Sequence, residues 1–243
     1  MITVYDQKMH MVRNITLLVL LAVSNVPLIH GESPFVPEAE FIIRSGMAEF
    51  ESVESLLEKP SKLQLDIQSW RVDGKRAIRT ETDYHAIYPV PVDYFLYELT
   101  NYENTKNNYP RVVESKLEYA SEDRFAKHSL WVHVRVKVLN FGAEYVYVTD
   151  NWMEKAGDGY IQKYNLNRSP DGTLYQMLGN YYVEEIIYEG KPHTYIRQYA
   201  ILGIKKGSRA MEIAMKAFGG WQLRQVFKNI YRAIEKRAEL VHM

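Results

Sequence analysis

No cysteine occurs in the chain, which excludes disulfide bonds, cysteine-ligated zinc, iron–sulfur clusters and thiol catalysis. Neither charge is in excess, because 30 Lys and Arg residues balance 30 Asp and Glu residues without a long run of one sign. The sequence therefore has no electrostatic footprint for nucleic acid, and we expect no nucleic-acid partner. Proline and glycine are sparse, at 9 and 13 residues, so a collagen-like or linker-dominated chain is excluded.

Tyrosine is what the chain has in abundance, with 19 among 243 residues. Hydrophobic residues make up 47% and charged residues 25%, as is usual for a packed globular protein. Tyrosine suits the outer face of a sheet, since its ring is apolar and its hydroxyl can be wetted. The same rings could line a cavity and hydrogen-bond a ligand, so composition leaves both interpretations open.

The first thirty residues have the pattern of a targeting segment. Lys8 and Arg13 precede an apolar run from Ile15 to Val23, and Pro27 interrupts the chain that follows. A run of nine residues is too short for a membrane-spanning helix, which needs about 20. The pattern is typical of a secretory signal peptide, which we place at residues 1–31. We therefore expect an exported protein, periplasmic or secreted; an uncleaved helix or a buried N-terminal strand is the alternative.

Hydrophobic periodicity predicts a helix, then a sheet, then a second long helix. Apolar residues recur every three or four positions before Pro60, which predicts an N-terminal helix within residues 36–60. Asp73-Gly74 lies between two alternating runs and predicts a β-hairpin, and Val92–Thr100 reads as a short helix. The predicted strands are Leu63–Val72, Lys75–His85, Arg111–Ala120, Leu130–Leu139, Ala143–Trp152, Tyr160–Asn167, Leu174–Tyr188 and His193–Ile204. Short turns between them imply an antiparallel meander.

The last helical region opens at Ser208. After Gly219-Gly220, its apolar residues follow an i, i+3, i+4, i+7 progression along one face. This is the element long enough to cover one side of the sheet, so we expect an α+β fold in which a curved antiparallel sheet wraps around the C-terminal helix. A helix cannot fill a curved sheet along its whole length, which predicts a ligand-binding space between them. The two glycines could let the first part of the helix, together with Trp221, swing as a gate.

Two segments resemble a known superfamily. Tyr145–Gly172 is similar to the strand ending in Trp, the Gly-containing turn, the second strand and the Pro-containing loop of the START-like, or SRPBCC, superfamily. Thr194–Ile204 and the long helix after it are similar to the end of that domain. The resemblance implies a helix-grip domain over residues 62–243 and a function in lipid transfer or polyketide cyclisation. Ala143-Glu144 stands where the family often has Arg-Asp, so no named subfamily is indicated.

The faces of the strands decide what would line the expected space. Turning the aliphatic face of each strand toward the helix buries no unpaired charge, and it leaves a glutamine as the lone polar contact. The ligand-binding residues predicted in this way are Val134, Val136, Val146, Val148, Ile196, Gln198, Leu202, Phe227, Ile230 and Ile234. The reverse assignment suits an amphipathic or anionic ligand, buries charge at a cost, and places inside His133, Arg135, Tyr147, Arg197 and Tyr199.

Residues that could carry catalysis or hold a metal are few. The sequence has no Gly-rich phosphate loop, no nucleophile elbow and no His-Glu-x-x-His pair. His128 and His133 are five apart around a strand start, which puts them on opposite faces and argues against a metal site. Arg79, Glu81 and Asp83 alternate on one strand and are best interpreted as a solvated face rather than an acid–base pair. We therefore expect no catalytic residue, no metal site and no cofactor.

The favoured hypothesis is an exported START-like domain that binds or carries a hydrophobic ligand, such as a lipid, between the sheet and the C-terminal helix. Its partner would be that small molecule or lipid, with transient membrane contact, and no protein partner is indicated. One alternative is a cyclase- or dehydratase-type enzyme of the same superfamily, using His133, Arg135 and Tyr147. The other is a non-catalytic envelope interaction or scaffold domain, whose partner surface would be formed by Tyr145, Tyr147, Tyr195 and Tyr199.

Overall fold

The structure is a computed structural model that describes residues 46, 52–58, 62–72, 74–123, 125–138 and 141–241. The predicted signal peptide at residues 1–31 lies outside the described residues and stays a prediction. In chain order the elements are α2 (Val53–Glu58), β1 (Lys62–Val72), β2 (Lys75–Tyr88), α3 (Val92–Thr100), the 3-10 helix η1 (Tyr102–Asn104), α4 (Thr105–Asn108), β3 (Val112–Tyr119), β4 (His128–Val138), β5 (Phe141–Ala156), β6 (Gly159–Arg168), β7 (Leu174–Tyr188), β8 (Lys191–Gly207) and α5 (Arg209–Val241).

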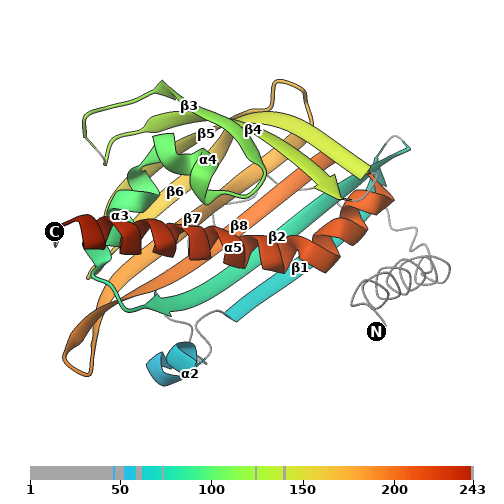
Figure 1. Ribbon diagram of the computed structural model, residues 1–243. Helices are drawn as coiled ribbons and strands as arrows, with labels where there is room; N and C mark the ends of the chain where they lie inside the picture. The colour runs from blue at the N-terminus through green and yellow to red at the C-terminus, as the bar shows by residue number, and fades with distance from the viewer. Residues whose placement is uncertain are drawn as a thin grey trace, which may run out of the picture. The chain divides into compact units, whose positions relative to one another are not determined.

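Eight strands form one antiparallel sheet in the order β1-β2-β8-β7-β6-β5-β4-β3. The sheet curves around α5, which runs across its concave side, and α3 and α4 lie beside the C-terminal half of α5 (Figure 1). This is the α+β helix-grip architecture that the sequence predicts. All eight predicted strands are present, and β7 has the predicted bounds.

Tight turns and one crossover set the order of the strands. Gly74 closes the β1–β2 hairpin with φ 74°, and Gly157 closes the β5–β6 hairpin with φ 59°. Glycine adopts these left-handed conformations without the steric cost that a Cβ would bring. After β2 the chain passes through α3, η1 and α4 to the far edge of the sheet, and β8 then returns to pair with β2.

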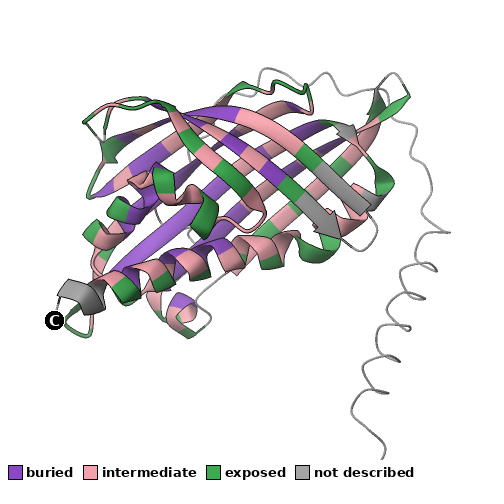
Figure 2. Ribbon diagram, turned by 45° about the horizontal axis from the view of Figure 1, so that its top comes forward, coloured by how far each residue is buried: buried purple, intermediate pink, exposed green. Residues whose placement is uncertain are grey.

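The main core lies between the sheet and the C-terminal half of α5. Phe227 is fully buried and stacks on Tyr84 of β2, with ring centroids 4.3 Å apart. Ile230 and Ile234 continue the same face of the helix and share a cluster with Phe95 of α3. Figure 2 shows buried residues gathered along the strands behind this part of the helix. Packing at this end therefore fixes α5 on the sheet.

The helix α5 is continuous from Arg209 to Val241, so the expected break at Gly219-Gly220 is absent. A Cβ atom added at Gly219 would lie 3.3 Å from Leu65 Cδ2, and one at Gly220 would lie 2.8 Å from Leu63 Cδ2. Both leucines belong to β1. The two glycines therefore serve the close approach of the helix to the edge strand, which is a packing role rather than that of a hinge.

Part of the outer face of the sheet is covered by α2. Of the helix expected within residues 36–60, the described part contains α2, whose Leu56 is fully buried. Leu56 packs with Ile87, Tyr182 and Tyr195, which point away from α5. This short helix is thus part of the domain's packing. The rest of the predicted helix lies outside the described residues, apart from Gly46 and Ser52.

A buried ion pair lies on this same outer face. Arg197 donates to the carboxylate of Asp83 through Nε at 3.0 Å and through Nη2 at 2.8 Å. The carbonyl oxygen of Gly46 accepts from Arg197 Nη1 at 3.1 Å and from the Tyr195 hydroxyl at 3.0 Å. His85 Nε2 lies 3.1 Å from Asp83 Oδ1. The solvated face expected for Asp83 is therefore wrong, because this carboxylate is 7% exposed and its partners are buried with it.

Replacing Arg197 with Met should lower the free energy of unfolding by about 3–5 kcal/mol, since it leaves the Asp83 carboxylate buried without its cation. The matched control is Arg135→Met, which breaks the pair with Glu144, where the two side chains are 56% and 51% exposed. We expect no measurable change for the control, because solvent and salt screen exposed ion pairs. Urea denaturation measures both variants, and equal losses would contradict the structural role of the buried pair.

Asp83 also predicts an acid dependence of stability. Burial by itself would raise its pKa, but hydrogen bonds and charge from His85 and Arg197 lower it from 3.8 to about 2. Because the pKa is lower in the folded state, this stabilisation is complete above about pH 4 and is lost as the pH falls toward 2. The shift corresponds to about 2 kcal/mol. Asp83→Asn should remove this part of the acid dependence in urea titrations between about pH 5 and 2, and an unchanged slope would refute it.

Candidate functional site

Cross-strand pairing identifies the side chains that face α5. Ile196 of β8 packs in one cluster with Phe227 of α5, which places the even-numbered residues of β8 on the concave face. Directly paired residues point to the same face of a sheet. Gln198 is paired with Tyr84 of β2 and Tyr181 of β7, so both tyrosines share this face.

The same rule reverses the expected face of β5. Tyr145 is paired with Val134 of β4, and Tyr145 and Tyr147 pack in one cluster with two methionines of α5. Tyrosines, not valines, therefore face the helix from β5. The prediction that Val146 and Val148 line this space is wrong, because the register with β4 sets the face and alternation places both valines outside.

The other predicted ligand-binding residues lie in two regions. Ile196, Phe227, Ile230 and Ile234 are at most 1% exposed and form a filled core at the C-terminal half of α5. The concave face of the sheet also carries Val134, Gln198 and Leu202. The side chain of Val136 lies outside the described residues. A ligand contact for any of these residues stays a prediction.

Apolar side chains under the N-terminal half of α5 are less completely buried than those under its C-terminal half. Several apolar side chains there keep partial exposure, although they pack around buried Ile78, Leu174 and Ile204. We call this set the open half of the grip, and its members are Ile67, Tyr145, Tyr147, Leu166, Met177, Leu202, Met211 and Met215. Such exposure means that water reaches apolar side chains on the concave face of the sheet and on α5.

Tyrosine hydroxyls give the open half a polar component. Burial raises the pKa of Tyr145 to about 12, against the opposing effect of the Arg111 charge, and burial raises the pKa of Tyr147 well above its usual range. Both phenols are therefore neutral at physiological pH and can donate or accept a hydrogen bond. Beside them, the hydroxyls of Tyr109 and Tyr181 form a hydrogen bond with each other at 2.7 Å.

Gln198 lies among these hydroxyls rather than among valines alone. Its Nε2 donates to the Tyr164 hydroxyl at 3.3 Å, while its buried Oε1 has no hydrogen-bond partner in the described structure. Gly179 makes room for this arrangement, because a Cβ atom there would lie 2.5 Å from the Tyr164 hydroxyl. A buried acceptor without a donor costs stability, so a ligand donor at this point would be favourable.

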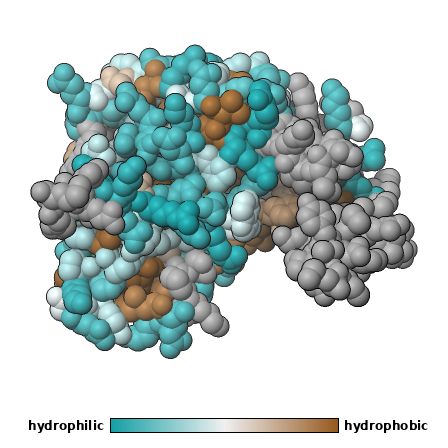
Figure 3. All heavy atoms as spheres, viewed as in Figure 1, coloured by the Kyte–Doolittle hydropathy of each residue, from teal (hydrophilic) through white to brown (hydrophobic). Residues whose placement is uncertain are grey.

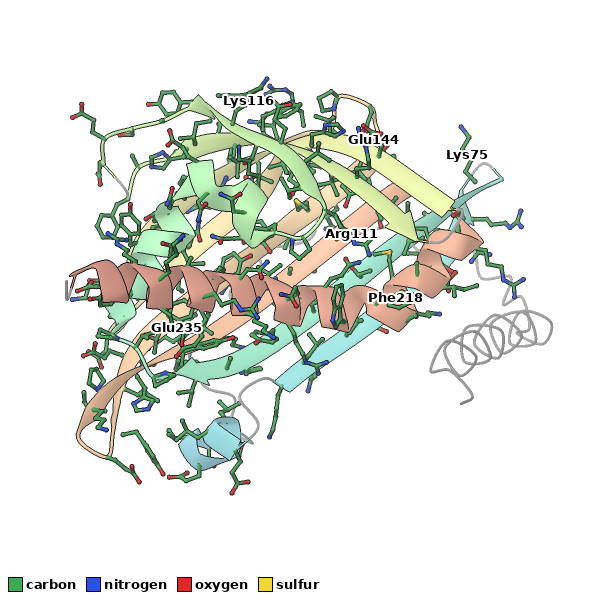
Figure 4. All side chains as sticks on the ribbon, in the orientation of Figure 1. Lys75, Arg111, Lys116, Glu144, Phe218 and Glu235 are labelled. Atoms are coloured by element: carbon green, nitrogen blue, oxygen red, sulfur yellow. The ribbon has the colours of Figure 1, made fainter. Side chains whose placement is uncertain are left out.

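Arg111 lies between α5 and the start of β3 (Figure 4). Its backbone has φ 75°, a left-handed conformation that is unfavourable for a residue with a side chain. With the Gln222 amide turned to accept, its oxygen lies 2.9 Å from Arg111 Nε and 3.2 Å from Nη2. The positive charge of Arg111 also lowers the pKa of Tyr145 in the open half, against the effect of burial. Sequence reasoning missed this residue, for which the preceding Pro110 is the one local signal.

The three residues expected to act together in the enzyme alternative do not lie on one face of the sheet. His133 and Arg135 both contact Glu144 on the outer face, with nitrogen–oxygen distances of 2.6 Å and 3.0 Å. Tyr147 points to the concave face, so the sheet separates it from the other two. The described residues therefore do not assemble the expected acid–base group.

The tyrosine surface expected for a scaffold domain is not formed by the described residues. Tyr145 and Tyr147 point toward α5, while Tyr195 and Tyr199 are at most 1% exposed on the outer face. Within the described part of the chain, no group of three His, Cys, Asp or Glu side chains is placed to hold a metal ion.

No protein-family model matches the chain, and no curated protein matches it. Solved structures do match. The Zhui aromatase/cyclase from a Streptomyces species superposes with a TM-score of 0.50 at 9% identity, covering 66% of this chain and 96% of that chain. A STAR-related lipid transfer protein from Xanthomonas axonopodis gives 0.48 at 12% identity, covering 71% and 99%. Human STARD10 gives 0.47 at 13% identity, covering 79% and 85%.

At such identities the likeness concerns the fold and not the activity. The strand order, the curvature of the sheet around α5 and the superposition on the aromatase/cyclase agree with one another. The chain therefore has the START-like (SRPBCC), or helix-grip, fold.

Proposed function

We propose that the protein is an exported carrier that holds a hydrophobic ligand, such as a lipid, in the open half of the grip. The observation that supports this most is the partial exposure of apolar side chains that face α5, Leu202 and Met177 among them. Covering apolar surface is favourable by about 25 cal/mol per Å². Export, to the periplasm or the medium, rests on the apolar run Ile15–Val23.

The hydroxyls narrow the class of ligand. Neutral Tyr145 and Tyr147 favour a molecule with a hydroxyl or carbonyl group over a plain hydrocarbon, because each polar group then finds a partner. Arg111 lies beside Tyr145 and suits an acidic or strongly polar end of the same molecule. The ligand class that fits is an amphipathic lipid or a lipid-like ring system.

A membrane-contact surface on α5 completes the proposal. Phe218 and Trp221, three residues apart, are 44% and 56% exposed. Figure 3 shows hydrophobic side chains at the surface over this half of the helix, and Figure 4 shows Phe218 on it. Between Ala217 and Tyr231 the helix has two basic residues, Arg224 and Lys228, and no acidic one. Exposed aromatic rings beside cations are suited to an anionic lipid surface.

None of the helices in the described part of the chain is both long and apolar enough to span a bilayer.

Leu202→Trp should reduce ligand occupancy at least tenfold, because the larger side chain fills the open half. Native mass spectrometry of the detergent-free protein, before and after incubation with a lipid panel, measures occupancy, and solvent extraction identifies the molecule. The control is Ile187→Trp on β7, a position that is 67% exposed and does not belong to the open half. An empty wild-type protein that takes up nothing from the panel would refute the proposal, and equal occupancy in the two variants would remove the open half as the site.

Replacing Phe218 and Trp221 together with Ser should weaken binding to vesicles of phosphatidylcholine with phosphatidylglycerol by tenfold or more. Burial of each ring stabilises the bound state by about 1.5–3 kcal/mol, and each nearby cation adds about 1 kcal/mol on an anionic surface. Vesicle sedimentation measures the binding, which should fall as salt rises. Ile187→Ser is the control for an exposed apolar side chain elsewhere, and an equal loss in that variant would contradict the assignment of the surface to α5.

A further inference from the structure

A second site lies outside the grip, where α3, η1 and α4 meet the C-terminal half of α5. The groove there has a volume of about 430 Å³, within the range of small-molecule sites. Its lining is polar and consists of Glu98, Asn104, Asn107, Asn108, Asn229, Arg232, Ala233, Lys236 and Arg237. It lies beside the helix turn that carries Glu235 (Figure 4).

The charge of this groove is one-sided. Arg232, Lys236 and Arg237 line it from α5, and Glu98 of α3 is the single acidic residue of the lining. Within the described part of the chain, none of the three cations forms an ion pair with Glu98 or with any other carboxylate. Cations and carboxylate therefore border the same space without neutralising each other, which leaves a net positive lining.

Arg237 is held in place by a neighbour that is not acidic. Its guanidinium stacks over the ring of Tyr97, 3.2 Å from the centroid. Stacking of this kind orients a guanidinium but leaves its N–H donors unused. Arg237 Nη1 is buried and has no hydrogen-bond partner in the described structure. A buried donor of this kind is costly unless an acceptor reaches it, and a ligand in the groove would supply one.

Glu98 lacks hydrogen-bond donors, as Arg237 lacks acceptors. Glu98 is 7% exposed, and among the described residues its carboxylate accepts one hydrogen bond, from Asn104 Nδ2 at 3.4 Å. Asn104 is in turn oriented by Asn107, whose Nδ2 donates to Asn104 Oδ1 at 2.6 Å. A carboxylate can accept several hydrogen bonds, so Glu98 still has capacity for a donor inside the groove.

We propose that this groove binds a phosphate ester that also carries a hydroxyl or ammonium group. The phosphate contacts Arg232, Lys236 and Arg237, and the donor group reaches Glu98. Phosphate carries about −1.5 to −2 charges at neutral pH, which matches the excess of two cations in the lining. Arginine also provides paired N–H donors for phosphate oxygens. The site does not depend on the ligand proposed for the grip.

Isothermal titration of the full chain with glycerol 3-phosphate and with phosphoethanolamine tests the proposal. We expect saturable binding that weakens with salt and falls at least tenfold in Arg232→Gln/Lys236→Gln. The control Lys155→Gln/Lys191→Gln removes two exposed charges elsewhere and should stay within twofold of the wild type. Glu98→Gln should weaken binding of phosphoethanolamine more than binding of inorganic phosphate, because it removes the acceptor for the ammonium group.

A second experiment, with vesicles of phosphatidylcholine and phosphatidic acid, distinguishes a soluble phosphate ester from the phosphate of a lipid headgroup. Binding of the soluble esters assigns the groove to a free metabolite. A lipid headgroup is assigned if only vesicles bind and the Arg232→Gln/Lys236→Gln variant loses that binding more than tenfold while Phe218 and Trp221 are intact. Binding of neither probe, or equal weakening in the groove and control variants, would overturn the proposal.

Discussion

The stacking of Phe227 on Tyr84 is the contact on which the rest of the arrangement depends. It fixes the C-terminal half of α5 on the sheet, where α3 closes the same cluster. The sheet curves away from a straight helix, so one end can be packed solidly while the other keeps inward side chains accessible. The filled core and the proposed ligand site therefore do not compete in this domain, because they involve different halves of one helix.

Tyrosine gives the open half both apolar surface and hydrogen-bonding groups. On β5 the rings of Tyr145 and Tyr147 provide apolar surface, and their neutral hydroxyls provide hydrogen bonds at the same positions. Valine at these positions would have accepted only a hydrocarbon. On the outer face, Tyr195 has another task, since its hydroxyl and Arg197 both donate to the Gly46 carbonyl. The abundance of tyrosine thus has two causes, one on each side of the sheet.

The strands could be predicted because each ends in turn residues, such as Asp73-Gly74, that leave little choice of register. The face of β5 could not, because Val146 and Tyr147 are both good strand residues and only pairing with β4 distinguishes them. The burial of Asp83 could not be predicted either, because its partner Arg197 is distant in the sequence. The phosphate groove lay beyond sequence reasoning for the same reason, with Glu98 and Arg237 on helices that only the tertiary fold brings together.

The central claim is that a ligand lies against the tyrosines of β5 under the N-terminal half of α5. The most direct measurement is an isotope-filtered nuclear Overhauser experiment on the ligand-loaded protein with labelled tyrosine rings, assigned with Tyr→Phe variants. The account predicts contacts from ligand protons to the rings of Tyr145 and Tyr147. Contacts confined to surface rings such as Tyr119, which is 60% exposed, would contradict it.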